Sequence, residues 1–128
     1  MALRVLIVDD VEDTRTCIRR LLEFEEGFEV AGEAGDGEEA IRKARELSPD
    51  CVLMDIHMPR VDGMAATRRI LQEQPSVVIV IMSVQGDDEY LESAVLAGAR
   101  GYLVKPFGPD ELVATLRRAC SLASEQAS

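Results

Sequence analysis

The sequence has 128 residues, of which 47% are hydrophobic and 30% are charged. This length and composition predict one globular domain with an ordinary apolar core and exclude a disordered chain. The formal net charge of −10 and the pI near 4.5 argue against direct binding to nucleic acid or to anionic membranes. We expect the domain to cover residues 1–124 and residues 125–128 to form a frayed tail.

The cysteines and the N-terminus give no sign of secretion. Cys17, Cys51 and Cys120 are widely separated and form no CxxC pair, so neither a disulfide framework nor a zinc site is predicted. The first apolar run is too short for a signal peptide, and no segment approaches the ~20 apolar residues that span a membrane. We therefore expect a cytoplasmic protein without a membrane partner.

The first half of the chain alternates short apolar runs with stretches of helical periodicity. The predicted elements are a strand at 3–9, a helix at 11–26, a strand at 28–34, a helix at 36–47 and a strand at 51–55. Gly27 ends the first helix, and Ser48-Pro49 ends the second. The third strand, "CVLMD", leaves its apolar run with an aspartate.

The second half continues the same alternation. The predicted elements are a helix at 63–74, a strand at 77–82, a helix at 87–98, a strand at 101–104 and a helix at 109–123. Pro75 and Gly98 end two of the helices, and Pro109 lies in the first turn of the last. Continuous Val, Ile and Leu runs are typical of strands covered on both faces, so we predict an α/β fold with a parallel sheet between helices.

Reactive side chains follow four of the five predicted strands. Strand one ends in Asp9-Asp10, strand three in Asp55, strand four in Ser83 and strand five in Lys105-Pro106. Ligands of such sheets bind at the carboxyl ends of the strands. Three acids, a hydroxyl and a lysine are therefore predicted to converge on one rim.

This set of side chains favours phosphoryl chemistry with a divalent cation. Oxygen-only ligands suit Mg²⁺ better than zinc, and a cation offsets the repulsion among the three acids. A lysine beside a hydroxyl can hold a phosphoryl group, and an aspartate among them can act as a nucleophile that forms an acyl phosphate. Asp55 ends its strand where a phosphoryl group can reach it.

Each residue also has an ordinary structural explanation. Asp10 precedes a helix and could simply cap its N-terminus, and Ser83 could cap the next helix in the same way. Lys105 alone would most often be a surface residue or form an ordinary ion pair, and Tyr102 would most often be part of the core. The conjunction of four strand ends with the needed chemistry favours the functional interpretation over these separate ones.

Four sequence stretches carry a resemblance to a known family. "LIVDD", "VLMDIHMPRVDGM", "VIVIMS" and "AGARGYLVKPF" have the order and spacing of response regulator receiver domains, the CheY-like domains of two-component signalling. The chain resembles that family from Leu3 to about Ala119. The resemblance implies a flavodoxin-like (βα)5 fold, a doubly wound five-stranded parallel sheet of order 2-1-3-4-5, which is the order of CheY itself, with helices on both faces.

The resemblance also implies a phosphorylation site and a metal site. Asp55 would be the phosphoacceptor. Asp10 would bind Mg²⁺ directly, Asp9 would act alongside it or through water, and the main-chain carbonyl of His57 would complete the protein ligands together with Asp55. Mn²⁺ is an alternative to Mg²⁺. The His57 imidazole would flank the site rather than bind the metal.

By the same resemblance, three further residues would hold and report the phosphoryl group. Lys105 and Ser83 would contact the phosphoryl oxygens, and Tyr102 would rotate between the two states. The Lys105–Pro106 peptide bond would be cis. These assignments are what the resemblance implies for this chain.

Two departures from the family pattern concern the rim of the site. Ser83 stands where threonine is commoner, and Val84 follows it where a smaller residue is commoner. A bulkier side chain would narrow access to Asp55. We hypothesise that Val84, His57 and Gln85 together set a dephosphorylation rate unlike that of fast chemotaxis regulators.

Three rival functions fit the sequence less well than a phospho-receiver does. A phosphatase of the haloacid dehalogenase type would carry a second acid where His57 stands. A flavodoxin would need a phosphate-binding loop in place of the acidic "DDVEDT" and more aromatic residues. A pure interaction module would show gaps among the strand-end residues. We therefore predict a signalling domain and not an enzyme, with at most self-phosphorylation from small donors and self-dephosphorylation.

The partners are expected from the family resemblance. A histidine kinase would donate the phosphoryl group, with Arg15 and Arg19 of the first helix on the side that faces it. The output would pass to a downstream effector protein or a fused output domain, with a homodimer as an alternative, through the surface between the fourth and fifth helices. That surface contains Glu89, Tyr90, Glu92 and Arg117.

Overall fold

The computed structural model describes residues 2–58, 61–84 and 89–127, in which strands and helices alternate without exception. The strands are β1 (Leu3–Val8), β2 (Phe28–Ala34), β3 (Cys51–Asp55), β4 (Val78–Val84) and β5 (Gly101–Lys105). The helices are α1 (Glu12–Glu23), α2 (Gly37–Leu47), α3 (Gly63–Glu73), α4 (Glu89–Ala97) and α5 (Pro109–Ala127). The predicted alternation of elements is confirmed.

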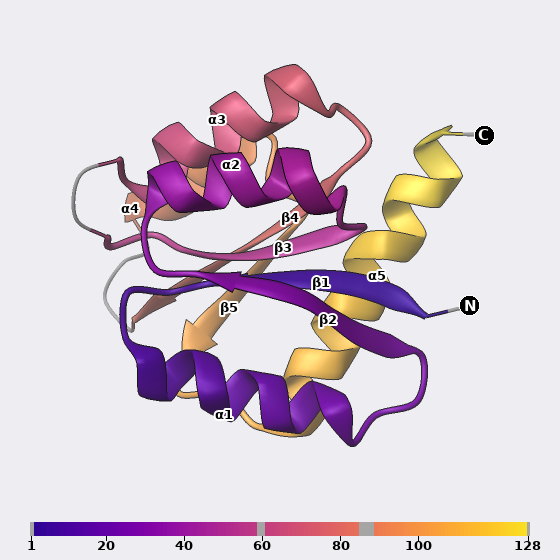
Figure 1. Ribbon diagram of the computed structural model, residues 1–128. Coiled ribbons are helices and arrows are strands. Elements are labelled where there is room, and N and C mark those ends of the chain that lie inside the picture. Colours follow the sequence, from indigo (N-terminus) through magenta and orange to yellow (C-terminus); the bar gives the residue numbers. More distant parts are fainter. Residues whose placement is uncertain (1, 59–60, 85–88, 128) are drawn as a thin grey trace.

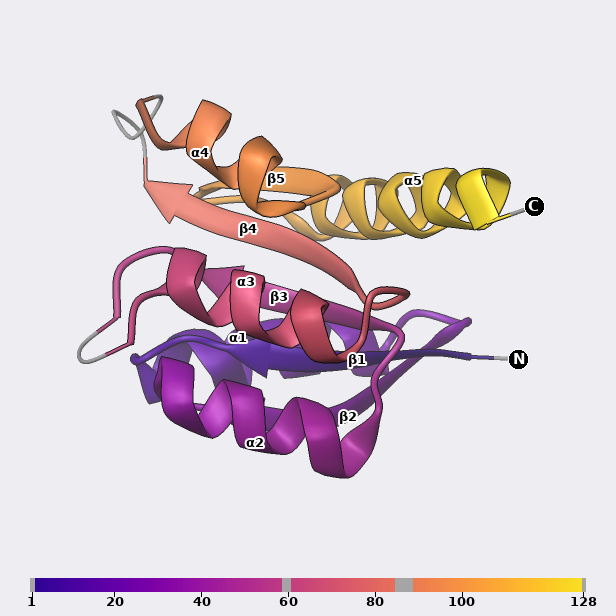
Figure 2. The ribbon, with the colours of Figure 1, turned by 90° about the horizontal axis from the view of Figure 1, so that it is seen from above.

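The strands form one parallel sheet in the order β2-β1-β3-β4-β5 (Figures 1 and 2). This is the flavodoxin-like order, so the predicted fold class is confirmed. The order reverses between β1 and β3, because the chain first builds outward to β2 and then returns to the other side of β1. The carboxyl ends of the strands gather on the left of Figure 1, away from both termini.

Alternate residues of each inner strand face opposite sides of the sheet, so each strand contributes to two apolar layers. One layer joins β-strand side chains such as Leu6 and Met54 to buried residues of α2, α3 and α4. The other joins side chains such as Ile7 and Leu53 to buried residues of α1 and α5. Both faces are therefore covered (Figure 1), as the continuous apolar strands predicted.

Several element boundaries differ from the predicted ones. β4 continues to Val84 rather than ending at Met82, because Ser83 and Val84 pair with Val104 and Lys105 of β5. Ser83 therefore lies within a strand. β1 stops at Val8, so Asp9 belongs to the loop that follows.

The last helix is longer than the sequence indicated. α5 runs to Ala127, so residues 125–127, which we expected to fray, are helical. Residues 124–127 contain no glycine or proline, and glutamate, glutamine and alanine all favour helix. The domain boundary at residue 124 stays a prediction. No helix in the described ranges combines the length and apolarity needed to cross a bilayer.

Candidate functional site at the carboxyl ends of the strands

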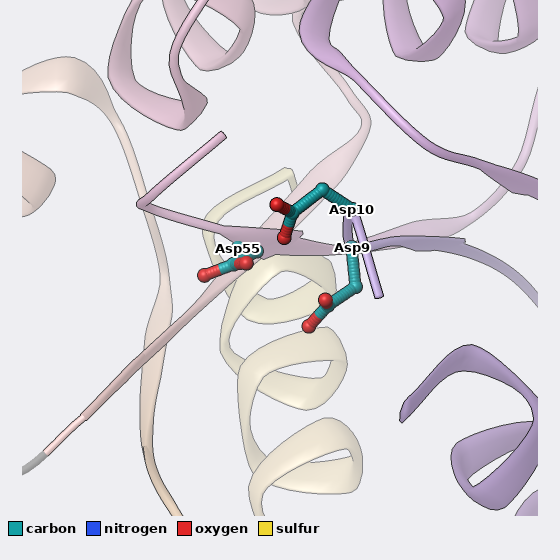
Figure 3. A group of neighbouring side chains, drawn as sticks. All are labelled: Asp9, Asp10 and Asp55. Atoms are coloured by element: carbon teal, nitrogen blue, oxygen red, sulfur yellow. The ribbon is translucent and has the colours of Figure 1, made fainter. Parts of the chain in front are cut away.

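Three carboxylates meet at the point where the strand order reverses. Asp9 and Asp10 directly follow β1, and Asp55 is the last residue of β3, the strand paired with β1 through Val8 and Met54. One oxygen from each carboxylate lies within 4.8 Å of the others. Figure 3 shows the three side chains grouped together. Asp9 is fully buried, Asp55 is 5% exposed and Asp10 lies open to solvent. The predicted convergence of the three acids is confirmed.

Asp9 is held on both of its carboxylate oxygens. Oδ1 accepts a hydrogen bond from the main-chain N–H of Val11 at 2.9 Å, and Oδ2 accepts one from Nζ of Lys105 at 2.6 Å. A buried carboxylate is costly unless it is paired and hydrogen-bonded. Both conditions are met here, because each carboxylate oxygen of the buried Asp9 has a hydrogen-bond donor.

Lys105 is placed between two of the acids. Its Nζ lies 2.6 Å from Oδ2 of Asp9 and 3.6 Å from Oδ2 of Asp55. Lys105 is the last residue of β5, two strands away from β3, so the fold itself carries this charge to the acids. Of the two ordinary explanations of Lys105, the surface residue is wrong, since the side chain is only 23% exposed, whereas the ion pair is present, with Asp9.

Burial is the main reason that the pKa of Asp55 is raised, to about 6, and the nearby Asp9 charge raises it further. Lys105 and the main-chain N–H of His57, which lies 3.3 Å from Oδ1, act in the opposite direction, while Asp10 adds a smaller upward effect. A carboxyl with this pKa is still about nine-tenths ionised at pH 7. The group is therefore available as a nucleophile but is destabilised in its charged form.

Ser83 contributes a buried hydroxyl with unused hydrogen-bonding capacity. Its residue is 1% exposed, and its Oγ has no hydrogen-bond partner among the described residues. Ser83 follows Met82, which pairs with Asp55 across β3 and β4. An unsatisfied buried hydroxyl costs about 1–3 kcal/mol, so its presence at this strand end suggests a ligand that would satisfy it.

The helix-cap explanation for Asp10 is also wrong. The N-cap position of α1 is Val11, and no side chain makes a capping bond there. The helices that do have aspartate caps show the contrast. Asp36 accepts from the N–H of Glu39 at the start of α2, and Asp62 accepts from that of Ala65 at the start of α3. Asp10 therefore has no local structural role of this kind.

The remaining predicted residues surround this centre. The exposed His57 places its ring edge-on to Tyr90, with ring centroids 5.4 Å apart. Val84 is 49% exposed and pairs with Lys105. The Lys105–Pro106 peptide bond is cis, the geometry implied by the family resemblance. Gln85 lies outside the described residues.

Tyr102 lies on the face of the sheet that α4 covers. It is half-buried and packs against the apolar layer that includes Ala94. It also lines a cavity of about 140 Å³ between α4 and β5, together with Leu91, Val95 and Arg100. The ordinary explanation of Tyr102 as a core residue therefore holds in part, and its ring also borders open space.

Two contributors to the site were not recognised from sequence. Gly63 packs directly on β3, because a Cβ atom there would lie 2.1 Å from the carbonyl oxygen of Asp55. Arg15 donates from Nη1 to the carbonyl oxygen of Asp9 at 2.6 Å. The sequence assigned Gly63 only to the start of a helix. Arg15 and Arg19 were expected to face a kinase, and both form ion pairs with Glu33 of β2.

The donor set fits a hard divalent cation. It consists of carboxylate oxygens that repel one another, with one exposed member that leaves room for water ligands. Mg²⁺ prefers such oxygen ligands and keeps several waters. Asp9, Asp10 and Asp55 could hold it, and the main-chain N–H of His57 donates to Asp55, so the chain at His57 passes the edge of the same site.

The sheet order and the strand-end acids define an α/β protein of the flavodoxin-like class with an oxygen-rich site at its topological switch point. The chain belongs to the response regulator receiver domains of two-component signalling, whose family model matches residues 5–117. The family resemblance of the four sequence stretches is thereby confirmed.

Curated relatives include both long and short proteins. The chain is 42% identical to the response regulator GacA of Pseudomonas aeruginosa over 116 residues, which are 91% of this chain and 54% of GacA. It is 41% identical to the chemotaxis protein CheY of Thermotoga maritima over 118 residues, which are 92% of this chain and 98% of CheY. The chain thus spans about half the length of the GacA relatives that it matches and nearly all of CheY.

Solved structures agree with this assignment. A two-component response regulator of the LuxR family from Aurantimonas sp. SI85-9A1 superposes with a TM-score of 0.89 at 36% identity, covering 94% of this chain and 86% of that one. NtrX from Brucella abortus gives a TM-score of 0.91 at 31% identity, covering 99% of this chain and 28% of NtrX. Both comparisons support the receiver fold over nearly the whole chain.

Proposed function

We propose that Asp55 accepts a phosphoryl group from a histidine kinase and that the chain then switches a protein-interaction surface. A carboxylate oxygen of Asp55 would attack phosphorus, forming an O–P bond as the P–N bond to the kinase histidine breaks. The observation that carries this proposal is the arrangement of Lys105 between Asp9 and Asp55 in a cluster of three carboxylates. That arrangement concentrates a nucleophile and a phosphoryl-binding cation at one point.

A divalent cation, Lys105 and Ser83 would each stabilise the phosphoryl group on Asp55 in a different way. Mg²⁺ or Mn²⁺, held by the three aspartates and the His57 carbonyl, would neutralise charge on the nucleophile and the phosphoryl group. Lys105 lies near enough to Asp55 to pair with a phosphoryl oxygen after transfer. The Ser83 hydroxyl, which has no partner in the described chain, would donate to another oxygen. Each contact is to a charged group and so is worth roughly 1.5–3 kcal/mol.

Two such contacts suffice for a substantial switch. Moving a two-state element from 1:99 to 99:1 takes about 5.5 kcal/mol of differential binding, which one hydrogen bond cannot supply. Ser83 and Lys105 together approach it. Rotation of Tyr102, which borders the cavity between α4 and β5, would transmit the change to the surface. We expect the active conformation to be partly populated before phosphorylation.

The output surface that we propose runs from α4 to α5. It exposes apolar side chains on α4 and β5, including Leu91, Val95 and Val104. The partner would be an effector protein, a fused output domain or a second copy of the chain. A fused domain is supported by relatives such as the transcriptional regulatory protein DegU of Brevibacillus brevis, of which this chain spans 49%.

The chain would be a signalling domain rather than an enzyme acting on other molecules. Its own chemistry would extend at most to self-phosphorylation from small phosphate donors and to hydrolysis of the resulting phosphoaspartate by water. The strongly acidic composition supports a cytoplasmic regulator that binds proteins and contacts neither nucleic acid nor membrane directly.

Mass spectrometry after incubation with acetyl phosphate and Mg²⁺ would test the proposal, with Asp55→Ala as the matched variant and beryllofluoride as a second ligand under native conditions. We expect an adduct that needs Mg²⁺ and is absent from Asp55→Ala. An adduct with beryllofluoride alone would show that access or a kinase limits phosphorylation. No adduct with either would contradict the proposal and favour a pure interaction module.

A further inference from the structure

Arg15 is the one basic residue of α1 that bonds directly to the loop carrying the acid pair, among the residues that the structure describes. Its Nη1 donates to the main-chain carbonyl of Asp9 at 2.6 Å. Its Nε donates to Oε1 of Glu33 on β2 at 3.2 Å. The side chain is only 18% exposed, so the guanidinium bridges α1, β2 and the loop after β1 from a largely enclosed position.

Glu33 is itself fixed by further contacts. Its carboxylate pairs with Arg19 as well as with Arg15, and Nζ of Lys43 on α2 donates to its main-chain carbonyl. The planar guanidinium of Arg15 has donors in a rigid fork, so holding its Nε on Glu33 also fixes the direction of its Nη1. The bond to Asp9 is therefore preorganised by the sheet edge.

The Asp9 carbonyl matters because it shares a planar peptide with the N–H of Asp10. The Asp10 carboxylate is exposed and receives no hydrogen bond from residues 2–58, 61–84 or 89–127. Its position therefore depends on the main chain that carries it. That main chain is held by three bonds. The N–H of Asp9 donates to the carbonyl of Ala34 at 3.1 Å, the N–H of Val11 donates to Oδ1 of Asp9 at 2.9 Å, and Arg15 donates to the Asp9 carbonyl.

We infer that Arg15 is a positioning residue for divalent-cation binding, which acts by fixing the Asp9–Asp10 peptide so that the exposed Asp10 carboxylate stays beside Asp55. This inference rests on the proposed function, because it requires the acids to bind a cation. The loss of Mg²⁺ affinity that it predicts on removal of Arg15 is opposite in sign to a simple charge effect. A positive guanidinium near the site repels a dication, so its removal would tighten binding if charge alone mattered.

Calorimetric titration of the metal-free protein with MgCl₂ separates the two effects. The variant is Arg15→Gln, and the matched control is Arg19→Gln, which removes the same charge and another bond to Glu33 but leaves the Asp9 carbonyl bonded. We expect Arg15→Gln to raise the Mg²⁺ dissociation constant roughly tenfold. This is the lower end of the affinity loss seen when a partner that orients metal ligands is removed. Arg19→Gln should stay within about twofold of wild type, because no ligand-bearing peptide loses a bond.

A third variant tests for rescue. Arg15→Lys keeps the charge and one donor and should recover part of the lost affinity, whereas a general loss of folding would not be rescued in this way. Thermal unfolding in EDTA, followed by far-UV circular dichroism, must show Arg15→Gln and Arg19→Gln to be folded at the titration temperature. If Arg15→Gln proves unfolded there, all the variants are titrated at a lower temperature at which circular dichroism shows Arg15→Gln to be folded.

The possible outcomes are distinct. Tighter or unchanged Mg²⁺ binding by a folded Arg15→Gln would overturn the positioning role of Arg15 and leave the proposed function intact. Equal weakening by Arg15→Gln and Arg19→Gln would also overturn it. Absence of Mg²⁺ binding by the wild-type protein would instead contradict the proposed function itself.

Discussion

The middle of the sheet and its carboxyl-terminal edge obey opposite physical rules. Along β3, Val52, Leu53 and Met54 are fully buried among apolar neighbours, and every such burial stabilises the fold. One residue later, Asp55 is nearly as buried but ionisable, and on the next strand Ser83 is buried without a hydrogen-bond partner among the described residues. The apolar interior stabilises the fold. The buried Asp55 and Ser83 at the edge destabilise it, and a bound ligand would satisfy both groups.

The largest expected effect comes from the interior. Leu53→Ala should lower the free energy of unfolding by about 2–5 kcal/mol, because it removes a fully buried side chain between β3 and the helices α1 and α5. Urea unfolding measures this change. Leu91→Ala on α4, where the side chain is 45% exposed, should change stability by about 0.5 kcal/mol or less. Equal losses for the two variants would contradict the picture of one apolar interior.

The next effect has the opposite sign and belongs to the edge. Asp55→Asn should raise the stability of the metal-free protein at pH 7.5, because the charged form of Asp55 is destabilised by burial and by Asp9. With the pKa raised from 3.8 to about 6, this penalty is complete above pH 6 and vanishes as pH falls below 3.8. After allowance for solvent screening, we expect a gain on the order of 1–2 kcal/mol.

Urea unfolding in EDTA at several pH values measures the difference between Asp55→Asn and wild type. The difference should shrink steadily from pH 7 to pH 4.5 as wild-type Asp55 takes up its proton. Added Mg²⁺ should stabilise wild type more than the variant, because the variant lacks one carboxylate of the cluster. A less stable Asp55→Asn at pH 7.5 would show that the charge of Asp55 does not destabilise the metal-free protein.

The interior could be predicted from sequence more fully than the edge. Apolar runs such as Cys51–Asp55 can be recognised directly in the sequence. Parallel strands align their carboxyl ends, so the order of elements predicted that the strand-end residues would meet, namely Asp9, Asp10, Asp55 and Lys105. The side-chain partners could not be predicted in the same way. Whether Lys105 pairs with Asp9 or with Asp55 depends on distances that no spacing encodes.

Arg15 shows the same limit on a helix. The family resemblance placed it on the side of the first helix that faces a kinase, where it would contact a partner. Its contact with the Asp9 carbonyl depends on how closely the start of α1 returns to the end of β1 and on the presence of Glu33 on the neighbouring strand β2. Both conditions are set by the tertiary structure. A single sequence supplies the residue types but not their pairing.

Two buried hydroxyls allow a smaller and more selective test of the edge. In the described chain, Ser83 Oγ and Thr67 Oγ1 are both buried without a hydrogen-bond partner. Ser83→Ala and Thr67→Val should therefore each leave stability unchanged or raise it by up to about 1 kcal/mol. Only Ser83→Ala should weaken beryllofluoride binding, by roughly tenfold for one lost charge-assisted hydrogen bond.

Titration of each variant with beryllofluoride in Mg²⁺ measures the dissociation constant, and thermal unfolding measures the stability. Thr67 lies on α3 rather than at a strand end, so it controls for removal of an unsatisfied hydroxyl in general. Equal binding by Ser83→Ala and wild type would exclude Ser83 as a phosphoryl contact. Weaker binding by both variants would point to a diffuse packing effect instead.

The smallest expected effect concerns Val84, the last residue of β4 and the register partner of Lys105. Its side chain is 49% exposed, so Val84→Ala costs little packing but removes bulk from the rim beside the cluster. We expect the phosphoaspartate half-life to shorten about two- to fivefold, a barrier change of about 1 kcal/mol or less, because water reaches the acyl phosphate more easily. Val95→Ala on α4, 62% exposed, is the matched truncation and should leave the half-life unchanged. An unchanged half-life in Val84→Ala would remove Val84 from the determinants of the rate and leave His57 and Gln85 as the flanking residues to test.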